Sequence, residues 1–272
     1  MNLAIIGCGY VGRAVAQYWH HKLLFRVSVT TTTPEKVPVL QTVAQKVTVL
    51  NCNDTQALKS FLHNQDVVLV SIARKGNSTY EDTYLRTARN LVSIISETSV
   101  KQIIYTSTCS VYGDRDGALV TEETPVKAIS ESEQVFNKTE QVLLGAGSDK
   151  LKVCIFRLGG IYGIGRELVK IYSRIAGKTR PGDGSRPVNW IHLDDIVGGI
   201  EFAREHQLAG IYNLVDDSQL TNKEVIETVC EKYNLPQVSW NPSLKADRSS
   251  LKVSNHKIKD AGYKLIHPQI LF

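Results

Sequence analysis

Three glycines near the N-terminus constrain the fold more than any other feature of the chain. The apolar residues 3–6 are followed by GCGYVG, and a helical pattern of apolar residues then covers 11–21. A strand, a G-x-G-x-x-G turn and a helix in this order are typical of a dinucleotide site. The first glycine permits the tight turn, the second lets the backbone approach the pyrophosphate, and the third lets the helix pack on the strand. We therefore predict that a dinucleotide contacts Gly7, Gly9, Tyr10, Val11 and Gly12, with its pyrophosphate at the helix N-terminus.

Short apolar runs alternate with helical patterns over the first 158 residues. The pattern predicts strands at 3–6, 25–30, 47–50, 67–72, 102–106 and 152–158. It predicts helices between them at 11–21, 55–63, 80–98 and 132–144. Strands connected by helices form a parallel sheet that is covered on both faces. The predicted fold class is therefore α/β, a Rossmann-type doubly wound parallel sheet.

The pattern changes after this region. Glycine and proline concentrate in GGIYGIG and GKTRPGDGSRP, and shorter elements follow to the end of the chain. We therefore divide the chain into a dinucleotide-binding domain, residues 1–158, and a smaller C-terminal substrate-binding lobe, residues 159–272. The apolar segments 188–191 and 210–214 are candidates for strands that return to the main sheet.

Composition excludes several classes of protein. The five cysteines are an odd number, far apart and without a C-x-x-C pair, which argues against a disulfide framework or a zinc site and for a reducing compartment. The net charge of +5 is spread without a dense basic run, so we expect an anionic small molecule and not a nucleic acid as the partner. The longest apolar run, 67–73, is too short to span a membrane. A strand that begins next to Met1 leaves no room for a signal peptide, so we expect a cytoplasmic protein. From the cysteine spacing we expect no metal site.

The end of the second predicted strand bears on the choice of dinucleotide. NAD sites place Asp or Glu there for the ribose 2′-hydroxyl, whereas NADP sites have to accommodate a 2′-phosphate. This chain reads VSVTTTTPEK, with hydroxyl side chains at Thr30, Thr31 and Thr32 and no carboxylate before Glu35. Arg13, just after the glycine turn, adds positive charge. The sequence favours NADP, with NAD as the alternative, and Asn51 is placed to touch the adenine.

Seven segments in order resemble the extended short-chain dehydrogenase/reductase family, in its nucleotide-sugar epimerase and dehydratase group. The segments are GCGYVG, DVVLVSIA at 66–73, YLRTARNL at 84–91, YTSTCSVYG at 105–113, FRLGGIYG at 156–163, NWIHLDDI at 189–196, and IYNLVDDSQLTNKEV with a later DAGY. The resemblance implies a nicotinamide dinucleotide that passes Ile72 and Ala73 at the end of a strand. It also implies a substrate held by the C-terminal lobe, and a homodimer is common in the family.

The resemblance also implies where acid–base chemistry belongs. The family uses a Ser or Thr after the fifth strand and Tyr-x-x-x-Lys on the next helix. By spacing from Tyr112, the hydroxyl position is Thr108. Lys138 is the natural candidate for the lysine, which would also hold the ribose, and Gln134 then stands at the tyrosine position. Glutamine forms hydrogen bonds but transfers no proton, and loss of an acid–base group costs roughly 10²–10⁴ in rate.

A second alignment of the same helix stays open. If Glu140 matches a later glutamate of the family, Ser132 and Phe136 occupy the tyrosine and lysine positions. Neither alignment supplies a phenol, because no tyrosine occurs between Tyr112 and Tyr162. Candidate substitutes are Tyr112, the helix-start glutamates Glu131 and Glu133, and His192, which has a suitable pKa. For His192, a packing role below the substrate is expected.

The substrate implied by the resemblance is a nucleotide sugar or a related anionic small molecule. Arg180 and Arg186, in a cationic segment of the C-terminal lobe, are candidates to bind it together with His192. The 4,6-dehydratases of the family carry Asp-Glu after the hydroxyl residue, where this chain has Cys109 and Ser110. Dehydration is therefore disfavoured. Two functions remain: an NADP-dependent oxidoreductase or epimerase with non-standard acid–base chemistry, and a weakly active or inactive NADP-binding sensor.

Overall fold

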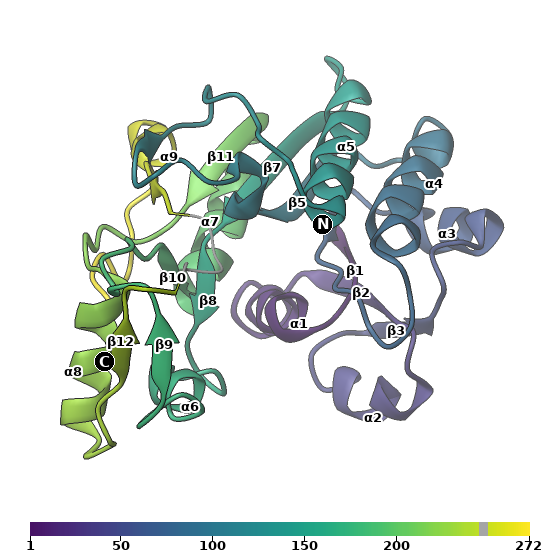
Figure 1. Cartoon of the computed structure of the whole chain (residues 1–272). Coiled ribbons are helices and arrows are strands. Elements are labelled where there is room, and N and C mark those ends of the chain that lie inside the picture. Colours follow the sequence, from purple (N-terminus) through teal and green to yellow (C-terminus); the bar gives the residue numbers. More distant parts are fainter. Residues whose placement is uncertain (245–249) are drawn as a thin grey trace. The chain divides into compact units, whose positions relative to one another are not determined.

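A computed structural model describes residues 1–244 and 250–272. The described chain divides into two compact units (Figure 1). The first unit comprises residues 1–111, 128–157 and 197–212, and the second comprises 112–127, 158–196 and 213–272. Among the described residues, no helix is both long enough and apolar enough to cross a membrane.

A central sheet organises the first unit. Its strands are β1 (Asn2–Ile6), β2 (Arg26–Thr31), β3 (Lys46–Val49), β4 (Val67–Val70), β5 (Gln102–Thr108), β7 (Lys152–Leu158) and β11 (Gly210–Leu214). Within the described residues these seven strands are ordered β3-β2-β1-β4-β5-β7-β11. The pairs from β3 to β5 are parallel, with Ala4 opposite both Ser28 and Val68. The strand order reverses at β1, because β2 and β3 lie on one side of it and β4 and β5 on the other. The switch point, where such sheets bind ligands, therefore lies between β1 and β4. The predicted doubly wound α/β fold is confirmed.

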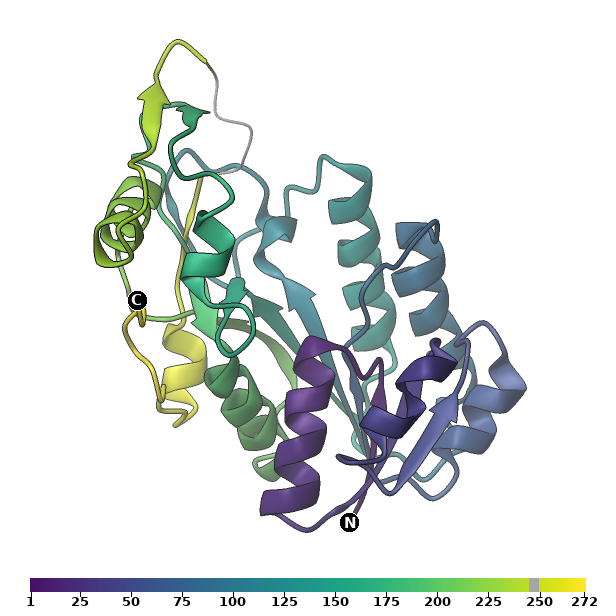
Figure 2. The ribbon, with the colours of Figure 1, turned by 90° about the horizontal axis from the view of Figure 1, so that it is seen from below.

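Helices cover both faces of this sheet. They are α1 (Tyr10–Gln17), α2 (Val37–Leu40), α3 (Thr55–Leu62), α4 (Arg86–Ile95), α5 (Glu131–Gly145) and α7 (Leu193–Glu205). Figures 1 and 2 show α4 and α5 side by side on the face opposite α1. Two helix starts follow from the sequence: Asp54 accepts a hydrogen bond from Ala57 N, and Ser130 forms a reciprocal capping box with Glu133.

The first unit has an apolar core between the sheet and the α3–α5 layer. Its members come from both, and include Ile6, Val68, Ile103, Leu91 and Leu143. On the other face, α1 is tied to α7, because the indole Nε1 of Trp19, just after α1, donates to Glu201 at 2.8 Å. Helices therefore pack on both faces of the sheet.

The second unit is built from short elements. Its strands form three parallel pairs: β8 (Gly160–Tyr162) with β10 (Trp190–His192), β9 (Thr179–Pro181) with β12 (Ser239–Asn241), and β6 (Leu119–Val120) with β13 (Lys252–Val253). Its helices are α6 (Leu168–Tyr172), α8 (Asn222–Lys232) and α9 (His256–Asp260). A separate apolar cluster, with Tyr162, Tyr172, Ile226 and Val229, packs α6 and α8 together.

The chain passes between the units more often than a single boundary near residue 158 predicts. The switch at 157/158 lies close to the predicted position, but 112–127 belongs to the second unit and 197–212 to the first. Strand β11 joins the main sheet, whereas β10 pairs with β8. These crossings carry no sequence signal, because they depend on pairings between distant segments.

Candidate cofactor and substrate sites

The three glycines of the turn differ in the space around them: Gly7 and Gly12 are closely packed, whereas Gly9 is open. Gly7 has φ +90°, and a Cβ there would lie 2.5 Å from Ser71 O. A Cβ on Gly12 would lie 2.4 Å from Gly7 O. A Cβ on Gly9, in contrast, meets no heavy atom of the described residues within 4 Å. The turn therefore leaves room beside Gly9, at the first turn of α1, where backbone N–H groups have no helical acceptor. An anionic pyrophosphate fits this position.

The three threonines at the end of β2 differ in their surroundings: two form hydrogen bonds within the loop, and one is exposed. Thr30 Oγ1 accepts a hydrogen bond from Gly7 N at 3.1 Å, and its side chain is buried. Thr31 is also buried, and its hydroxyl accepts from Thr33 N at 3.1 Å. Thr32 is exposed. Thr30 and Thr31 thus support the loop and Thr32 faces outward, and the predicted contacts of all three with the cofactor stay predictions.

Basic side chains gather at the same edge. Burial raises the pKa of the Cys8 thiol to about 12, and the charges of Arg13 and Lys36 oppose this rise, which places both cations near the turn. Lys75, in the loop after β4, donates from Nζ to Thr33 Oγ1 at 2.8 Å. Sequence reasoning missed Lys75, although a basic residue just after a strand at the switch point was a usable signal.

The remaining predicted cofactor residues lie at the carboxyl ends of neighbouring strands. Ile72 and Ala73 follow β4, and Ile72 Cγ2 lies 2.8 Å from a Cβ built on Gly7. Asn51 follows β3 and is exposed, with its Oδ1 accepting from Asn53 N at 3.0 Å. Because parallel strands end at one edge, all of these positions lie at the same edge of the sheet as the glycine turn.

A buried ion pair fixes which face of α5 packs inward. Arg157 on β7 contacts Glu140 on α5 through Nη2 at 2.6 Å, and both side chains are almost fully buried. Ser107 Oγ on β5 donates to the same carboxylate at 2.5 Å. The face of α5 that carries Glu140 is therefore the face that packs on the sheet.

Phe136 and Ser132 share this face, one and two turns before Glu140. The Phe136 ring packs on Tyr84 with ring centres 4.8 Å apart and on Tyr80 at 5.7 Å. The hydroxyl of Tyr84 accepts from Arg74 N, in the loop after β4, at 3.1 Å. The face of α5 that is connected to the cofactor loop thus carries Ser132 and Phe136.

Gln134 and Lys138 lie elsewhere on α5. Each is two residues from this face, roughly 200° around the helix, and both side chains are exposed. The Gln134 amide donates to Ile129 O at 3.2 Å, before the helix. Gln134 and Lys138 therefore lie on a different face of α5 from Ser132 and Phe136, and the predicted roles of Gln134 at the tyrosine position and of Lys138 as ribose anchor stay predictions.

The two hydroxyl candidates after β5 differ in access. Thr108 is half-buried, and its hydroxyl donates to Ser110 Oγ and accepts from Ser110 N, both at 3.2 Å. Its predicted contact with a substrate stays a prediction. Tyr112 is fully buried, and its hydroxyl donates to Asn213 at 2.7 Å. This contact gives Tyr112 a supporting role in the second unit, and its predicted part in catalysis stays a prediction.

The predicted substrate residues lie in the second unit. Arg180 is on β9, Arg186 precedes β10, and both are half-buried. His192 ends β10, where its ring packs on Tyr162 with centres 5.0 Å apart. Burial and the proximity of His267 lower the pKa of His192, so its imidazole is neutral at pH 7.

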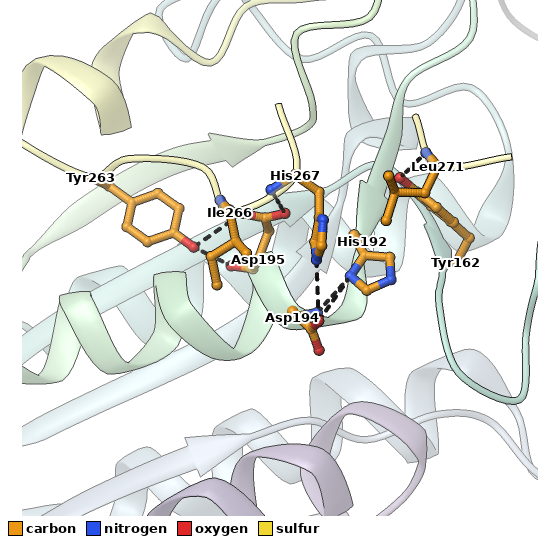
Figure 3. A network of polar contacts seen from close by, with 8 residues as sticks. All are labelled: Tyr162, His192, Asp194, Asp195, Tyr263, Ile266, His267 and Leu271. Atoms are coloured by element: carbon orange, nitrogen blue, oxygen red, sulfur yellow. Dashed lines mark hydrogen bonds and ion pairs between the residues drawn. The ribbon is translucent and has the colours of Figure 1, made fainter. Parts of the chain in front are cut away.

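The C-terminal segment reaches His192 through an anchor that sequence reasoning did not single out. The carboxylate of Asp195 is fully buried and accepts hydrogen bonds from Ile266 N at 2.6 Å and from His267 N at 3.0 Å (Figure 3). Tyr263 donates to Asp195 O at 2.9 Å. His267 is consequently held with its ring centre 4.1 Å from that of His192. The D-D pair of the NWIHLDDI segment was the available signal.

Comparison with known proteins identifies the class. The sequence profile of the NAD dependent epimerase/dehydratase family matches residues 4–214, and the chain belongs to this family. Protein YeeZ of Escherichia coli K12 is 26% identical over 211 residues, which cover 77% of this chain and 74% of YeeZ. A dTDP-glucose 4,6-dehydratase of Streptomyces griseus is 28% identical over 165 residues, covering 57% of this chain and 50% of that enzyme.

Solved structures share the fold at low identity. DesIV, a dTDP-glucose 4,6-dehydratase from Streptomyces venezuelae solved with NAD and TYD, has a TM-score of 0.80 at 20% identity, covering 100% of this chain and 93% of DesIV. MoeE5 in complex with UDP-glucuronic acid and NAD has a TM-score of 0.83 at 18% identity, covering 97% and 94% of the two chains.

Proposed function

We propose that this chain binds NADP in preference to NAD and acts on a nucleotide sugar or a related anionic small molecule. The observation that carries the proposal is the open position beside Gly9 at the start of α1, in a turn whose other two glycines are closed by packing. When bound, the dinucleotide supplies hydride transfer. The predicted cytoplasmic location and homodimer stay predictions.

The preference for NADP rests on charge at the end of β2. Lys75 is held against Thr33 at this edge, Arg13 and Lys36 lie near the turn, and no carboxylate precedes Glu35. A ribose 2′-phosphate carries negative charge, which these cations would stabilise, whereas the NAD 2′-hydroxyl needs an acceptor such as Asp or Glu.

Thermal unfolding with each cofactor tests this proposal. A ligand at 100 times its Kd adds about 2.7 kcal/mol to the free energy of unfolding, so NADP is expected to raise Tm clearly more than NAD at equal concentration. Gly9→Leu is expected to remove both shifts without lowering the Tm of the free protein, because its side chain enters open space. Lys75→Ala is expected to reduce the NADP shift alone.

Lys150, an exposed lysine away from the turn, provides the matched control, since Lys150→Ala is expected to leave both shifts unchanged. Equal shifts with NAD and NADP would disprove the preference. No shift with either cofactor would disprove dinucleotide binding.

The sensor function is the second candidate, and one observation favours it. The face of α5 connected to the cofactor loop presents Ser132 and Phe136, neither of which exchanges a proton at neutral pH. An enzyme would then depend on Thr108 and on a proton donor from elsewhere. Wild-type turnover that falls in Thr108→Ala would support the enzyme, whereas NADP binding without turnover of nucleotide sugars would support the sensor.

Restoring a phenol and a lysine discriminates between the two alignments of α5. Ser132→Tyr combined with Phe136→Lys places them one turn apart on the face that carries Glu140, where the lysine charge lowers the pKa of the phenol. We expect this pair to raise NADP-linked turnover of nucleotide sugars, and Thr108→Ala to cancel the gain.

Gln134→Tyr is the matched control, because it places a phenol one turn from Lys138 on the exposed face. A gain with Gln134→Tyr and none with the double variant would show that the first alignment is correct. Far-UV circular dichroism and cofactor binding verify that Phe136→Lys, which removes a ring from the Tyr80–Tyr84 cluster, still folds.

A further inference from the structure

Three side chains in the second unit converge on one another: His192, which is also a predicted substrate residue, Asp194 and His267. Asp194 Oδ2 lies 3.5 Å from His192 Nδ1 and 3.2 Å from His267 Nε2. One potential ligand atom from each residue lies within 4.8 Å of the others (Figure 3). The two histidines come from β10 and from the C-terminal segment, which are far apart in the sequence.

We propose that His192, Asp194 and His267 bind a divalent transition metal ion of the class that includes Zn²⁺. Metal–ligand bonds of about 2.0–2.1 Å at tetrahedral angles separate two ligand atoms by roughly 3.4 Å. The two distances to Asp194 Oδ2, 3.2 and 3.5 Å, already bracket that separation. The remaining pair, the two histidine nitrogens, lies within 4.8 Å, so metal binding brings these atoms closer by at most about 1.4 Å.

The types of the ligand atoms define the class of ion. Two imidazole nitrogens with one carboxylate oxygen suit Zn²⁺ and its neighbours, whereas Mg²⁺ and Ca²⁺ prefer oxygen ligands alone. His192 Nδ1 accepts a hydrogen bond from the backbone N–H of Asp194 at 3.2 Å, so this nitrogen carries the lone pair that a metal ion needs. The metal would exchange that hydrogen bond for a coordinate bond.

The surroundings hold two ligands rigidly and leave the third accessible. The backbone N–H of His267 is fixed by the buried Asp195 carboxylate, and the His192 ring is packed on Tyr162. The side chains of His192 and His267 are 13% and 21% exposed, whereas that of Asp194 is 58% exposed. The ion would enter from the Asp194 side, and water would complete its coordination as the fourth ligand.

The proposal is tested on the untagged full chain after removal of metals with EDTA. Isothermal titration with Zn²⁺ is expected to show one site per chain, and Co²⁺ is expected to give the visible absorption of a low-symmetry nitrogen–oxygen site. Mg²⁺ is expected not to bind. His267→Ala and Asp194→Asn are each expected to weaken Zn²⁺ binding at least tenfold.

His256→Ala is the matched control, because His256 is an exposed histidine of the same unit outside the cluster. Asp194→Asn keeps the test decisive if His267→Ala loosens the C-terminal segment, since the Asp194 side chain is largely exposed. Failure of the wild type to bind Zn²⁺, or equal binding by wild type and both variants, would show that the three residues form a hydrogen-bonded cluster only.

Discussion

Glu140→Gln is expected to lower the free energy of unfolding by about 3–5 kcal/mol, because it leaves the buried charge of Arg157 without its carboxylate. The wild-type pair is bidentate, with Arg157 Nε at 3.1 Å and Nη2 at 2.6 Å from Glu140 Oε2 and Nε also 3.2 Å from Oε1. Ser107 loses a charged acceptor as well. Urea denaturation followed by circular dichroism measures the change as a lower midpoint.

Two comparisons show whether the loss of stability in Glu140→Gln comes from losing the ion pair itself or from leaving the Arg157 charge buried without a partner. Glu140→Leu with Arg157→Met replaces both charges with apolar groups and is expected to recover much of the stability. Glu97→Gln breaks the exposed Lys59–Glu97 pair and is expected to cost less than about 1 kcal/mol. A loss of under 1 kcal/mol in Glu140→Gln would contradict the assignment of Glu140 as the buried partner of Arg157.

The stability of the second unit is expected to fall as the pH rises from about 4 to 7, because of Asp216. Burial raises the pKa of this carboxyl to about 7, Asp217 and Asp195 add to the shift, and hydrogen bonds from Ser218 oppose it. The folded protein then binds a proton that the unfolded chain has released, so stability decreases with pH across this window. The total effect approaches about 4 kcal/mol, since each pKa unit corresponds to about 1.4 kcal/mol.

Asp216→Asn removes the ionisable group and is expected to flatten this dependence. The measured quantity is the difference in the free energy of unfolding between wild type and variant at pH 5 and at pH 7.5, which cancels the contributions of other carboxylates. Asp260→Asn, at an exposed position in the same unit, is expected to change the difference little. A wild-type curve parallel to that of Asp216→Asn would show that Asp216 is ionised throughout.

The fold was predictable because its signals are local. GCGYVG, the apolar runs and the helix cap at Asp54 each lie within a few residues, and the strands they predict form the main sheet. The positions for which the sequence left alternatives depend on distant contacts. The direction in which α5 faces is set by Arg157, and one sequence does not show that Glu140 and Arg157 meet.

In the candidate site, too, local sequence signals were predictable and contacts between distant residues were not. The three glycines were predictable from spacing, whereas the burial of Thr30 follows from its hydrogen bond to Gly7. Tyr112 was named for its residue type, and its burial against Asn213 became visible only in the folded unit. Lys75 and His267 were missed because their partners, Thr33 and Asp194, are far from them in the sequence.

The crossing of the chain between its two units limits how the protein can be dissected. A fragment ending at residue 158 keeps the glycine turn but loses β11, which exposes the edge of β7 to pairing with other chains. It also loses α7, so Trp19 Nε1 loses Glu201 and the buried Gln102 amide loses its acceptor, Ala203 O, at 2.8 Å. Segment 197–212 would therefore have to be supplied with any minimal cofactor-binding fragment, as a graft or through circular permutation.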